Sequence, residues 1–283
     1  MGPLMMVFLN GQFVPEGQAS VSVFDRGFLY GDGLFEGIRI HQGKPFRWKQ
    51  HFQRFRCGAE FLKIALPFSS DALRNFADEL IVRNQMPDCL LRIVLSRGVG
   101  VRGYSPKGAE HPTLVMSLHS VPTSSPRRGW RLVTAPFCLP ASDPLFQFKT
   151  CNKLAQILAR AHADDVGADE ALLLNSDDCV VEASSGNLFW LVDESVCTPP
   201  IAAGVLPGVT RAVVVQLCHS MGLTVRETSP GLPDLIGAEG LFLSLSSIGL
   251  AEGVSLDGLR LARSAVVTEL DRAYWNLVRE ETA

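Results

Sequence analysis

The stretch GADEALLLNSDDCVVEASSGNLF, residues 167–189, carries the pattern that decides the fold of this chain. Its apolar runs and their continuation predict short strands at residues 170–174, 180–181 and 187–192. Small polar residues form a turn between the last two strands, and Glu182 stands at the start of that turn. A carboxylate at this point can hold a protonated pyridine nitrogen, which makes Glu182 a candidate site residue. The alternative is a strand-end carboxylate that faces solvent.

Strands and helices alternate on both sides of this stretch, so the predicted fold class is α/β, of the α+β type. Apolar runs predict strands at residues 5–10, 34–41, 90–95, 113–118 and 240–246. Helical spacing predicts helices at residues 48–64, 71–84, 152–163 and 210–221. The third of these helices is amphipathic, and its apolar side holds Leu154, Ile157, Leu158 and Ala161.

Residues 120–129, SVPTSSPRRG, are polar and include two prolines, which makes them the best linker candidate in the chain. The expected organisation is an N-terminal α/β domain at residues 1–120, a linker at 121–129 and a larger C-terminal domain at 130–283. A ligand site is commonly found at such a domain interface.

The composition excludes several classes of protein. Hydrophobic residues make up 47% and charged residues 19%, and the net charge is −3 with both signs interspersed, as in an ordinary globular protein. No basic stripe predicts a nucleic-acid partner, and no apolar run approaches the roughly 20 residues of a membrane helix. The seven cysteines form no C-x-x-C pair and are odd in number, so neither a metal site nor a disulfide framework is expected. Because residues 1–11 also lack a signal-peptide pattern, a cytoplasmic protein is expected.

Lys149 is the first candidate for chemistry. It ends the apolar stretch Phe146-Gln147-Phe148 and stands just before a predicted helix. A lysine that is partly desolvated in this way is suited to form a Schiff base with a carbonyl group. The alternative is a lysine whose stem packs on apolar surface while its ammonium group reaches water.

Three features supply candidate ligands for a phosphate group. Gly208 gives the backbone freedom to turn before a predicted helix, Thr210 is expected to cap that helix, and a helix N-terminus suits an anion. The serines in the stretch 244–247 bring hydroxyl groups to the end of a buried strand. Arg54 lies three residues after His51 on one predicted helix, and arginine is well suited to a phosphate dianion. Each feature also has an ordinary explanation: a capped helix, a strand-end turn and a surface arginine.

In their order along the chain, these candidates resemble the class IV, or fold type IV, family of pyridoxal-phosphate enzymes. That family includes branched-chain aminotransferases, D-amino-acid aminotransferases, (R)-selective amine transaminases and 4-amino-4-deoxychorismate lyase. The resemblance covers nearly the whole chain and runs through FLNG (8–11), DRGFLYGDG (25–33), FEGIR (35–39), His51-x-x-Arg54, Lys149-x-x-Asn152, GADEA (167–171), Glu182-x-x-x-x-Asn187-Leu188-Phe189, GVTR (208–211) and the serines at 244–247.

The resemblance implies a smaller N-terminal α/β domain and a larger C-terminal pseudo-barrel domain, with pyridoxal 5'-phosphate between them, usually in a homodimer. Lys149 resembles the lysine that forms the aldimine with the cofactor and moves the proton between the substrate α-carbon and C4′. Glu182 resembles the residue that binds the pyridine nitrogen. The phosphate ligands implied are Arg54, Val209 through its backbone N–H, Thr210 and Ser246. Ser247 resembles part of the boundary between the phosphate site and the substrate-carboxylate site.

Two stretches bear on the substrate. The stretch FEGIR is similar to the branched-chain enzymes, which implies that Phe35 and Arg39 contact the substrate. The stretch RGVGVRGYS is similar to the aminodeoxychorismate lyases, and its Arg102 and Tyr104 fall where D-amino-acid aminotransferases carry an Arg-x-His carboxylate trap. We therefore hypothesise that Arg102, from the loop of the neighbouring subunit, binds a substrate carboxylate. The alternative is a loop arginine that is paired with an acid.

The resemblance thus implies an aminotransferase that moves an amino group between an amino acid, or an amine, and a 2-oxo acid through Lys149. The alternative within the family is a 4-amino-4-deoxychorismate lyase that releases pyruvate and 4-aminobenzoate. Two other functions stay open: a non-catalytic protein that binds pyridoxal phosphate, and an α/β interaction domain. Lys149 argues against the first of these, because binding alone needs no proton shuttle.

Overall fold

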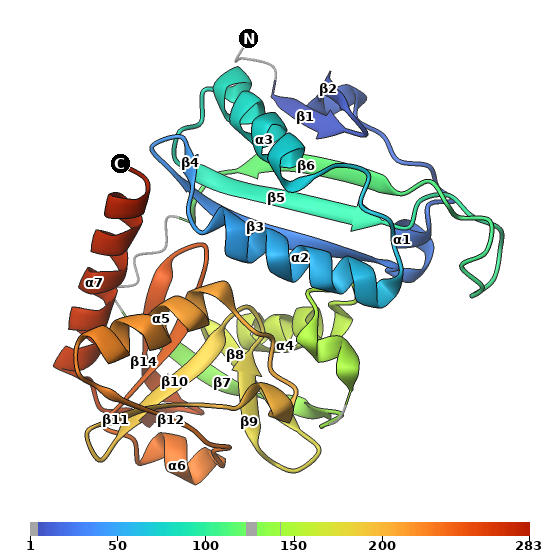
Figure 1. Cartoon of the computed structure of the whole chain (residues 1–283). Coiled ribbons are helices and arrows are strands. Elements are labelled where there is room, and N and C mark those ends of the chain that lie inside the picture. Colours follow the sequence, from blue (N-terminus) through green and yellow to red (C-terminus); the bar gives the residue numbers. More distant parts are fainter. Residues whose placement is uncertain (1–4, 123–128, 142) are drawn as a thin grey trace. The chain divides into compact units, whose positions relative to one another are not determined.

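The computed structural model describes residues 5–122, 129–141 and 143–283 (Figure 1). The chain forms two compact units. Of the described residues, unit 1 contains those up to 121 together with 148–152 and 278–283, and unit 2 contains those within 122–147 and 153–277. Most of the expected linker, residues 123–128, lies outside the described residues. The sequence pattern gave no sign that 148–152 belongs with unit 1, although this segment carries Lys149.

Unit 1 is built on a six-stranded antiparallel sheet with the strand order β2-β1-β6-β5-β3-β4. Its strands are β1 (Met6–Leu9), β2 (Gln12–Pro15), β3 (Gly33–His41), β4 (Lys44–Pro45), β5 (Cys89–Ser96) and β6 (Thr113–His119). Its helices are α1 (Arg26–Tyr30), α2 (Trp48–Leu62) and α3 (Ser70–Asn84), with a 3-10 helix at Glu16–Gln18. Helices α2 and α3 cover one face of the sheet (Figure 1). The strands and helices predicted for this part of the chain are confirmed to within a few residues.

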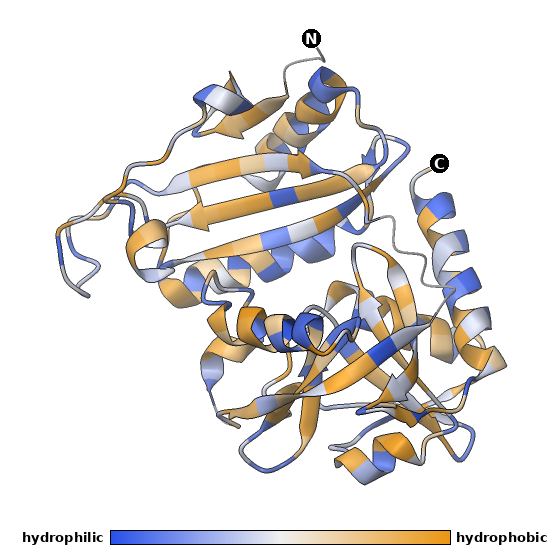
Figure 2. Ribbon diagram, turned by 180° about the vertical axis from the view of Figure 1, so that it is seen from behind, coloured by the Kyte–Doolittle hydropathy of each residue, from blue (hydrophilic) through white to orange (hydrophobic). Residues whose placement is uncertain are grey.

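Burial in the core of unit 1 follows the period of two in its strands. The ribbons of these strands are largely hydrophobic, with a few hydrophilic residues between the apolar ones (Figure 2). Leu34 and Ile38 of β3 and Leu91 of β5 are buried in one apolar cluster with side chains of α2 and α3. The intervening residues of these strands, Phe35 and Arg92 among them, point to the other face. The sheet thus separates its packing face from the face on which Phe35 stands.

Unit 2 contains a nine-stranded sheet with the order β12-β11-β10-β13-β14-β7-β8-β9, and β15 pairs with β14. Strand β9 pairs with β8 and, through Glu182 and Asn187, also with β10, so the sheet curves back on itself. This is the barrel-like domain that the resemblance implied. The strands are β7 (Trp130–Leu139), β8 (Glu170–Asn175), β9 (Val180–Ala183), β10 (Asn187–Val192), β11 (Ser195–Thr198), β12 (Thr224–Glu227), β13 (Gly240–Leu245), β14 (Gly249–Leu256) and β15 (Leu259–Arg260). The helices are α4 (Leu154–Asp165), α5 (Val209–Ser220), α6 (Leu232–Ile236) and α7 (Ala265–Glu281), with 3-10 helices at Pro144–Gln147 and Ile201–Ala203.

Helix α4 was predicted from its spacing, but its large apolar side chains are not buried in the unit. Leu154, Ile157 and Leu158 are 68%, 60% and 53% exposed. The buried residues of α4 are Gln156, Ala159 and Ala163, and the two alanines pack in a cluster with side chains of β7 and β8. Small side chains let the helix approach the sheet closely, and the larger apolar side chains form an exposed stripe.

Within the described residues, none of the helices combines the length and the hydropathy needed to cross a lipid bilayer. The same residues contain no group of three or more His, Cys, Asp and Glu side chains arranged to hold a metal ion.

Candidate functional site

Lys149 is held against the edge of strand β3 by backbone hydrogen bonds. Its carbonyl oxygen accepts a 2.9 Å bond from the N–H of Phe35, and the N–H of Cys151 donates a 2.9 Å bond to the carbonyl oxygen of Gly33. The two bonds flank a β-bridge between this segment and β3. The backbone of Lys149 is therefore an extension of the sheet, and its position depends on β3.

The Lys149 side chain lies over an aromatic ring. Its ammonium nitrogen is 4.6 Å from the centroid of the Phe35 ring, and the guanidinium carbon of Arg92 is 4.2 Å from the same centroid. Both contacts have the geometry of cation–π interactions. The charges of Lys149 and Arg92 give the surface around the Phe35 ring a positive potential, which suits an anionic ligand. Arg92 was not selected from the sequence, although a single arginine inside an apolar strand is a signal that the sequence contains.

Arg39 stands on the same strand as Phe35 but in different surroundings. It is 8% exposed, and its Nη2 lies 3.7 Å from a carboxylate oxygen of Asp88. Four residues along a strand correspond to roughly 13 Å. The structure therefore places Arg39 apart from Lys149, while it brings Phe35 and Lys149 together.

Glu36 points to the face opposite Phe35, where its carboxylate is 1% exposed. Its Oε1 accepts a 2.7 Å hydrogen bond from Nε of Arg54, and its Oε2 accepts a 2.7 Å bond from Nη2 of the same arginine. The Oε2 atom also lies 2.8 Å from Nδ1 of His51. Burial alone raises the pKa of Glu36, but the charge of Arg54 and the hydrogen bond with His51 outweigh burial and lower that pKa to about 2.

The Glu36 carboxylate orders both His51 and Arg54. Burial lowers the pKa of His51, and the positive charges of Arg54 and Lys149 act in the same direction against the influence of Glu36. A neutral His51 ring with its proton on Nδ1 donates a hydrogen bond to Glu36. The two parallel bonds from Arg54 fix the plane of the guanidinium group. The expected phosphate ligand Arg54 is thus oriented by Glu36, a residue that the sequence did not single out.

In unit 2, the Glu182 carboxylate lies beside the segment that leads into α5. Its Oε2 accepts a 3.3 Å bond from the N–H of Leu206, and the carbonyl oxygen of Leu206 accepts a 2.9 Å bond from the side-chain amide of Asn187. Glu182 pairs with Asn187, and Asn187 with Ser244, across adjoining strands. Directly paired residues share one face of a sheet, so these three side chains stand in a row. At 8% exposed, Glu182 is not the solvent-facing carboxylate of the alternative.

A second buried carboxylate fixes the turn after Glu182. Glu170 is 1% exposed, and it accepts hydrogen bonds from the hydroxyl groups of Ser184 and Ser185. The sequence marked Glu170 only as part of the GADEA motif. Its contacts show that it holds the small polar turn in one conformation.

Helix α5 begins at a glycine that has no room for a side chain. Gly208 is the N-cap residue, and a Cβ atom there would lie 1.9 Å from Oδ1 of Asn187. The prediction that Thr210 caps the helix is wrong, because Thr210 is already the second residue of α5 and no side chain caps the helix. The N–H groups of Val209 and Thr210 have no acceptor within the helix and lie at the positive end of its dipole.

Hydroxyl groups stand beside this helix start. The Oγ1 of Thr210 lies 3.1 Å from Oγ of Ser246, and Ser247 follows in the same turn after β13. Ser244 has a buried hydroxyl group for which the described residues provide no hydrogen-bond partner. Unit 2 thus combines N–H donors, hydroxyl donors and a buried carboxylate. This set fits the phosphate and the pyridine nitrogen of pyridoxal phosphate.

Arg102 and Tyr104 lie in the loop between β5 and β6, residues 97–112, and both are exposed. Tyr104 is 88% exposed, and its ring meets the ring of Tyr30 edge-on at a centroid distance of 5.6 Å. The structure therefore brings these two candidates together on one loop of unit 1, with their side chains directed away from its core.

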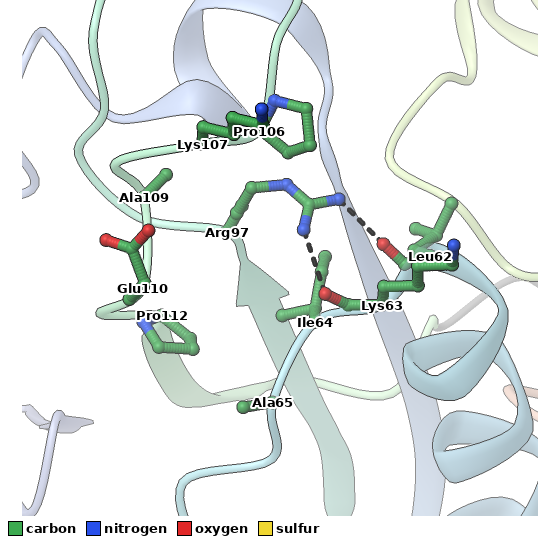
Figure 3. A pocket seen from close by; sticks show the side chains of 10 residues that line it. All are labelled: Leu62, Lys63, Ile64, Ala65, Arg97, Pro106, Lys107, Ala109, Glu110 and Pro112. Atoms are coloured by element: carbon green, nitrogen blue, oxygen red, sulfur yellow. Dashed lines mark hydrogen bonds between the residues drawn. The ribbon is translucent and has the colours of Figure 1, made fainter.

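A cavity of about 360 Å³ lies at the base of loop 97–112 (Figure 3). Arg97 borders it and donates hydrogen bonds of 2.7 Å and 3.0 Å to the carbonyl oxygens of Leu62 and Lys63 at the end of α2. The lining residues are Leu62, Lys63, Ile64, Ala65, Arg97, Pro106, Lys107, Ala109, Glu110 and Pro112. None of them is a candidate site residue, so the cavity is separate from the chemistry described above.

Known proteins are similar to the chain over nearly all of its length. The family model of amino-transferase class IV matches residues 33–256. A putative branched-chain-amino-acid aminotransferase from Methanocaldococcus jannaschii is 35% identical over 269 residues, which is 95% of this chain and 93% of that protein. An aminodeoxychorismate lyase from Vibrio harveyi is 32% identical over 249 residues, 87% of this chain and 89% of that protein. A solved branched-chain amino acid aminotransferase from T.th., complexed with N-(5'-phosphopyridoxyl)-L-glutamate, has a TM-score of 0.90 and 27% identity over 96% of this chain and 93% of that one.

The Glu36 cluster predicts a specific loss of stability in acid. The folded-state pKa of Glu36 is about 2 against an ordinary value of 4.5, so the unfolded chain binds this proton more readily. The resulting stabilisation, roughly 3 kcal/mol, is fully present above the ordinary value and is lost as the pH falls toward 2. The lowered pKa of His51 adds a further loss of stability that begins as the pH falls below 6.5.

Urea unfolding across this pH range measures the free energy of unfolding. In Glu36→Gln, the dependence of this free energy on pH between 4.5 and 2 becomes shallower. The matched control Glu79→Gln, at an exposed pair with Arg83, leaves it unchanged; equal slopes in both variants would contradict the assignment.

Gly208→Ala tests the start of α5 as an anion site. The added methyl group must displace Asn187 or the backbone, which we expect to cost about 1–3 kcal/mol of stability and to weaken pyridoxal-phosphate binding roughly ten-fold or more. Gly231→Ala is the control, because Gly231 is also an N-cap residue but its Cβ would meet no atom closer than 3.5 Å. Cofactor titration of both variants is the measurement. Wild-type affinity in Gly208→Ala would show that the phosphate binds elsewhere.

Proposed function

Because the chain belongs to the amino-transferase class IV family, we propose that it transfers an amino group between an amino acid, or another primary amine, and a 2-oxo acid. Pyridoxal 5'-phosphate is its cofactor. The observation that carries the proposal is the lysine fixed by backbone bonds to β3, with its ammonium nitrogen 4.6 Å from the Phe35 ring centroid. A protein that only binds the cofactor needs phosphate and pyridine ligands, but no lysine that is positioned in this way.

We assign the cofactor ligands as follows. Glu182 holds the proton on the pyridine nitrogen, since its carboxylate is withdrawn from water beside the backbone of Leu206. The N–H groups at the start of α5 bind the phosphate together with hydroxyl groups and one arginine. These phosphate ligands are Val209, Thr210, Ser246 and Arg54, and Ser247 borders the substrate carboxylate. Glu36 keeps the guanidinium plane of Arg54 in place for this contact.

The residues of the chain then divide the chemical work. When bound, pyridoxal phosphate supplies an electron sink that makes the hydrogen on the substrate α-carbon acidic. The Lys149 amine takes the proton from the α-carbon and delivers it to C4′, as a general base and then a general acid. The β3 edge fixes the backbone that carries this amine. Lys149 and Arg92 both lie over the Phe35 ring, and their positive charges attract an anionic substrate.

Lyase activity is the second candidate function, with 4-amino-4-deoxychorismate as substrate and pyruvate and 4-aminobenzoate as products. The similarity to the Vibrio harveyi lyase and the stretch RGVGVRGYS favour it. Both reactions begin with removal of the same α-proton by Lys149. The assigned residues are therefore shared, and only the fate of the substrate tells the two functions apart.

We further propose that the protein is a homodimer. Exposed apolar side chains support this: in unit 1, Phe24 and Phe28 are 64% and 75% exposed, and in unit 2 the stripe of α4 is exposed. Such patches on a folded protein mark interaction surfaces. A dimer also gives a role to Arg102 and Tyr104, which extend from loop 97–112 and would bind the substrate carboxylate in the site of the neighbouring subunit. The seven cysteines, all free thiols, support a reducing, cytoplasmic setting.

The visible absorption spectrum of the purified protein tests the proposed function directly. D-alanine, D-glutamate, L-leucine and an (R)-amine are added one at a time. Loss of the cofactor band with one donor establishes amino transfer and identifies the class of donor. A band that persists with every donor moves the assignment to the lyase, which is then tested by pyruvate release from aminodeoxychorismate. If no band forms even after pyridoxal phosphate is added, the assignment of Lys149 as the residue that binds the cofactor covalently is wrong.

Lys149→Ala is expected to bind pyridoxal phosphate but to lose the absorption band of the lysine-linked cofactor. Turnover should fall about 10²–10⁴-fold or more, because the variant lacks the group that moves the proton. Lys49→Ala, an exposed lysine on α2, is the matched control and should keep both the band and the turnover. Normal turnover in Lys149→Ala would exclude Lys149 as the residue that moves the proton.

Ile157→Asp tests the dimer. A carboxylate in the middle of the α4 stripe must be desolvated when the stripe is covered, so we expect dimer dissociation to be favoured at least ten-fold. Val82→Asp is the control, since Val82 is also an exposed apolar residue on a helix, 75% exposed on α3. Sedimentation equilibrium of wild type and both variants gives the answer. A wild-type monomer would refute the dimer, and an unaffected Ile157→Asp dimer would remove α4 from its interface.

A further inference from the structure

Arg26 joins helix α1 to the tip of loop 97–112. Its Nη1 donates a 2.8 Å hydrogen bond to the carbonyl oxygen of Gly103, and its Nη2 donates a 3.2 Å bond to the carbonyl oxygen of Tyr104. Its backbone N–H donates a 2.9 Å bond to the carbonyl oxygen of Gly98 at the start of the loop. One residue therefore holds the loop at three points, two of them at the tip.

An ion cluster keeps the Arg26 side chain in place. Its Nε donates a 2.8 Å bond to Oδ2 of Asp32, and Arg97 donates bonds of 2.8 Å and 3.1 Å to the two oxygens of the same carboxylate. The side chain of Arg26 is 4% exposed and that of Asp32 is 16% exposed. Burial raises the pKa of Asp32, but its hydrogen bonds to Arg97 and Arg26 and their charges outweigh burial and lower the pKa. Asp32 thus remains an anion that fixes both arginines.

The backbone of the loop leaves little space around Arg26. Gly98 has a φ of +86°, and a Cβ atom there would lie 1.9 Å from the carbonyl oxygen of His111. A Cβ atom on Gly100 would lie 2.8 Å from the Cβ of Ala109 and 3.1 Å from Cδ of Arg26. The two sides of the loop are therefore in contact near its base, with the Arg26 stem packed against one of them.

Tyr30, at the end of α1, supports the same tip. Its hydroxyl group accepts a 3.1 Å bond from the N–H of Gly103. Its ring centroid is 4.9 Å from the guanidinium carbon of Arg26 and 5.6 Å from the centroid of the Tyr104 ring. The backbone that follows Arg102 is thus bound at both its N–H and carbonyl groups, although the side chains of Arg102 and Tyr104 are exposed.

We propose that Arg26 is a positioning residue for substrate recognition, which fixes the tip of loop 97–112 so that Arg102 and Tyr104 meet the substrate carboxylate in a defined geometry. This role rests on the proposed function of those two side chains. A salt bridge to Asp32 would need only one of the guanidinium nitrogens. The other two are used on consecutive carbonyl oxygens of the loop tip, a geometry that lysine cannot reproduce.

The test uses the holoenzyme with Arg26→Gln, Arg26→Lys and Tyr30→Phe, and with Arg83→Gln as the control for loss of an exposed, ion-paired arginine. Hydrogen exchange of the amides of 101–105 and tryptic cleavage after Arg102 and Lys107 report on the loop. Steady-state kinetics with the best donor report on recognition. We expect the Arg26 variants to exchange and be cleaved roughly ten-fold faster, and KM to rise roughly ten-fold with a smaller change in kcat. The cofactor band should be unchanged, and Tyr30→Phe should show a smaller effect centred on Gly103.

Each outcome decides the proposal. Exchange and cleavage at the wild-type rate in both Arg26→Lys and Tyr30→Phe would overturn it, even if Arg26→Gln does not fold. A loosened loop with unchanged KM would also overturn it, provided that Arg102→Ala does raise KM. If Arg102→Ala leaves KM unchanged for every donor, the loop has no part in recognition. The role of Arg26 then fails together with that part of the proposed function, while the Lys149 experiments stand independently.

Discussion

The two backbone hydrogen bonds between β3 and the segment 148–152 determine where Lys149 stands, and the site in unit 1 depends on them. Strand β3 pairs with β5 in register from Gly33 to Ile40, and this pairing sets which residues face which side. Phe35 is thereby placed under the lysine and Glu36 on the side of Arg54. A slip of one residue would exchange the two faces. The apolar core beneath β3, which specifies its register, therefore also specifies the surroundings of the Lys149 amine.

Buried or partly buried carboxylates order several of the residues to which we assign contacts with small molecules, or the residues that support them. Glu36 fixes the guanidinium plane of Arg54, Asp32 holds Arg26 and Arg97, and Glu170 holds the turn after Glu182. A buried carboxylate is costly unless donors satisfy it, so its partners are held wherever the acid is held. None of these three acids is assigned to the substrate or the cofactor. They keep the cations and hydroxyl groups in fixed positions and so reduce the reorganisation that binding requires.

The sequence predicted what local patterns encode. Strands β8, β9 and β10 followed from apolar runs and turn residues, and Glu182 from its place at the end of one run. Thr210 was wrongly expected to cap α5, because the close approach of Asn187 to Gly208, which a single sequence does not show, requires glycine at the cap. The outward apolar stripe of α4 was not foreseen, since a core and an interface produce the same helical spacing. The contacts of Phe35 with Lys149 and of Arg26 with the tip of its loop join residues far apart in the chain, for which one sequence carries no signal.

The division between fixed backbone and exposed side chain has a consequence for substrate choice. Ordering a flexible loop on binding costs conformational entropy for every residue that becomes fixed. In loop 97–112 the contacts of α1 fix the backbone of the tip during folding. Under the proposed role of this loop, substrate binding then orders only side-chain torsions, such as those of Arg102 and Tyr104. Substitutions at these exposed positions leave the supporting bonds intact, because Arg26 and Tyr30 bind backbone groups of the tip and not side chains. Under the proposed role of this loop, specificity can therefore change at the tip without loss of the loop conformation.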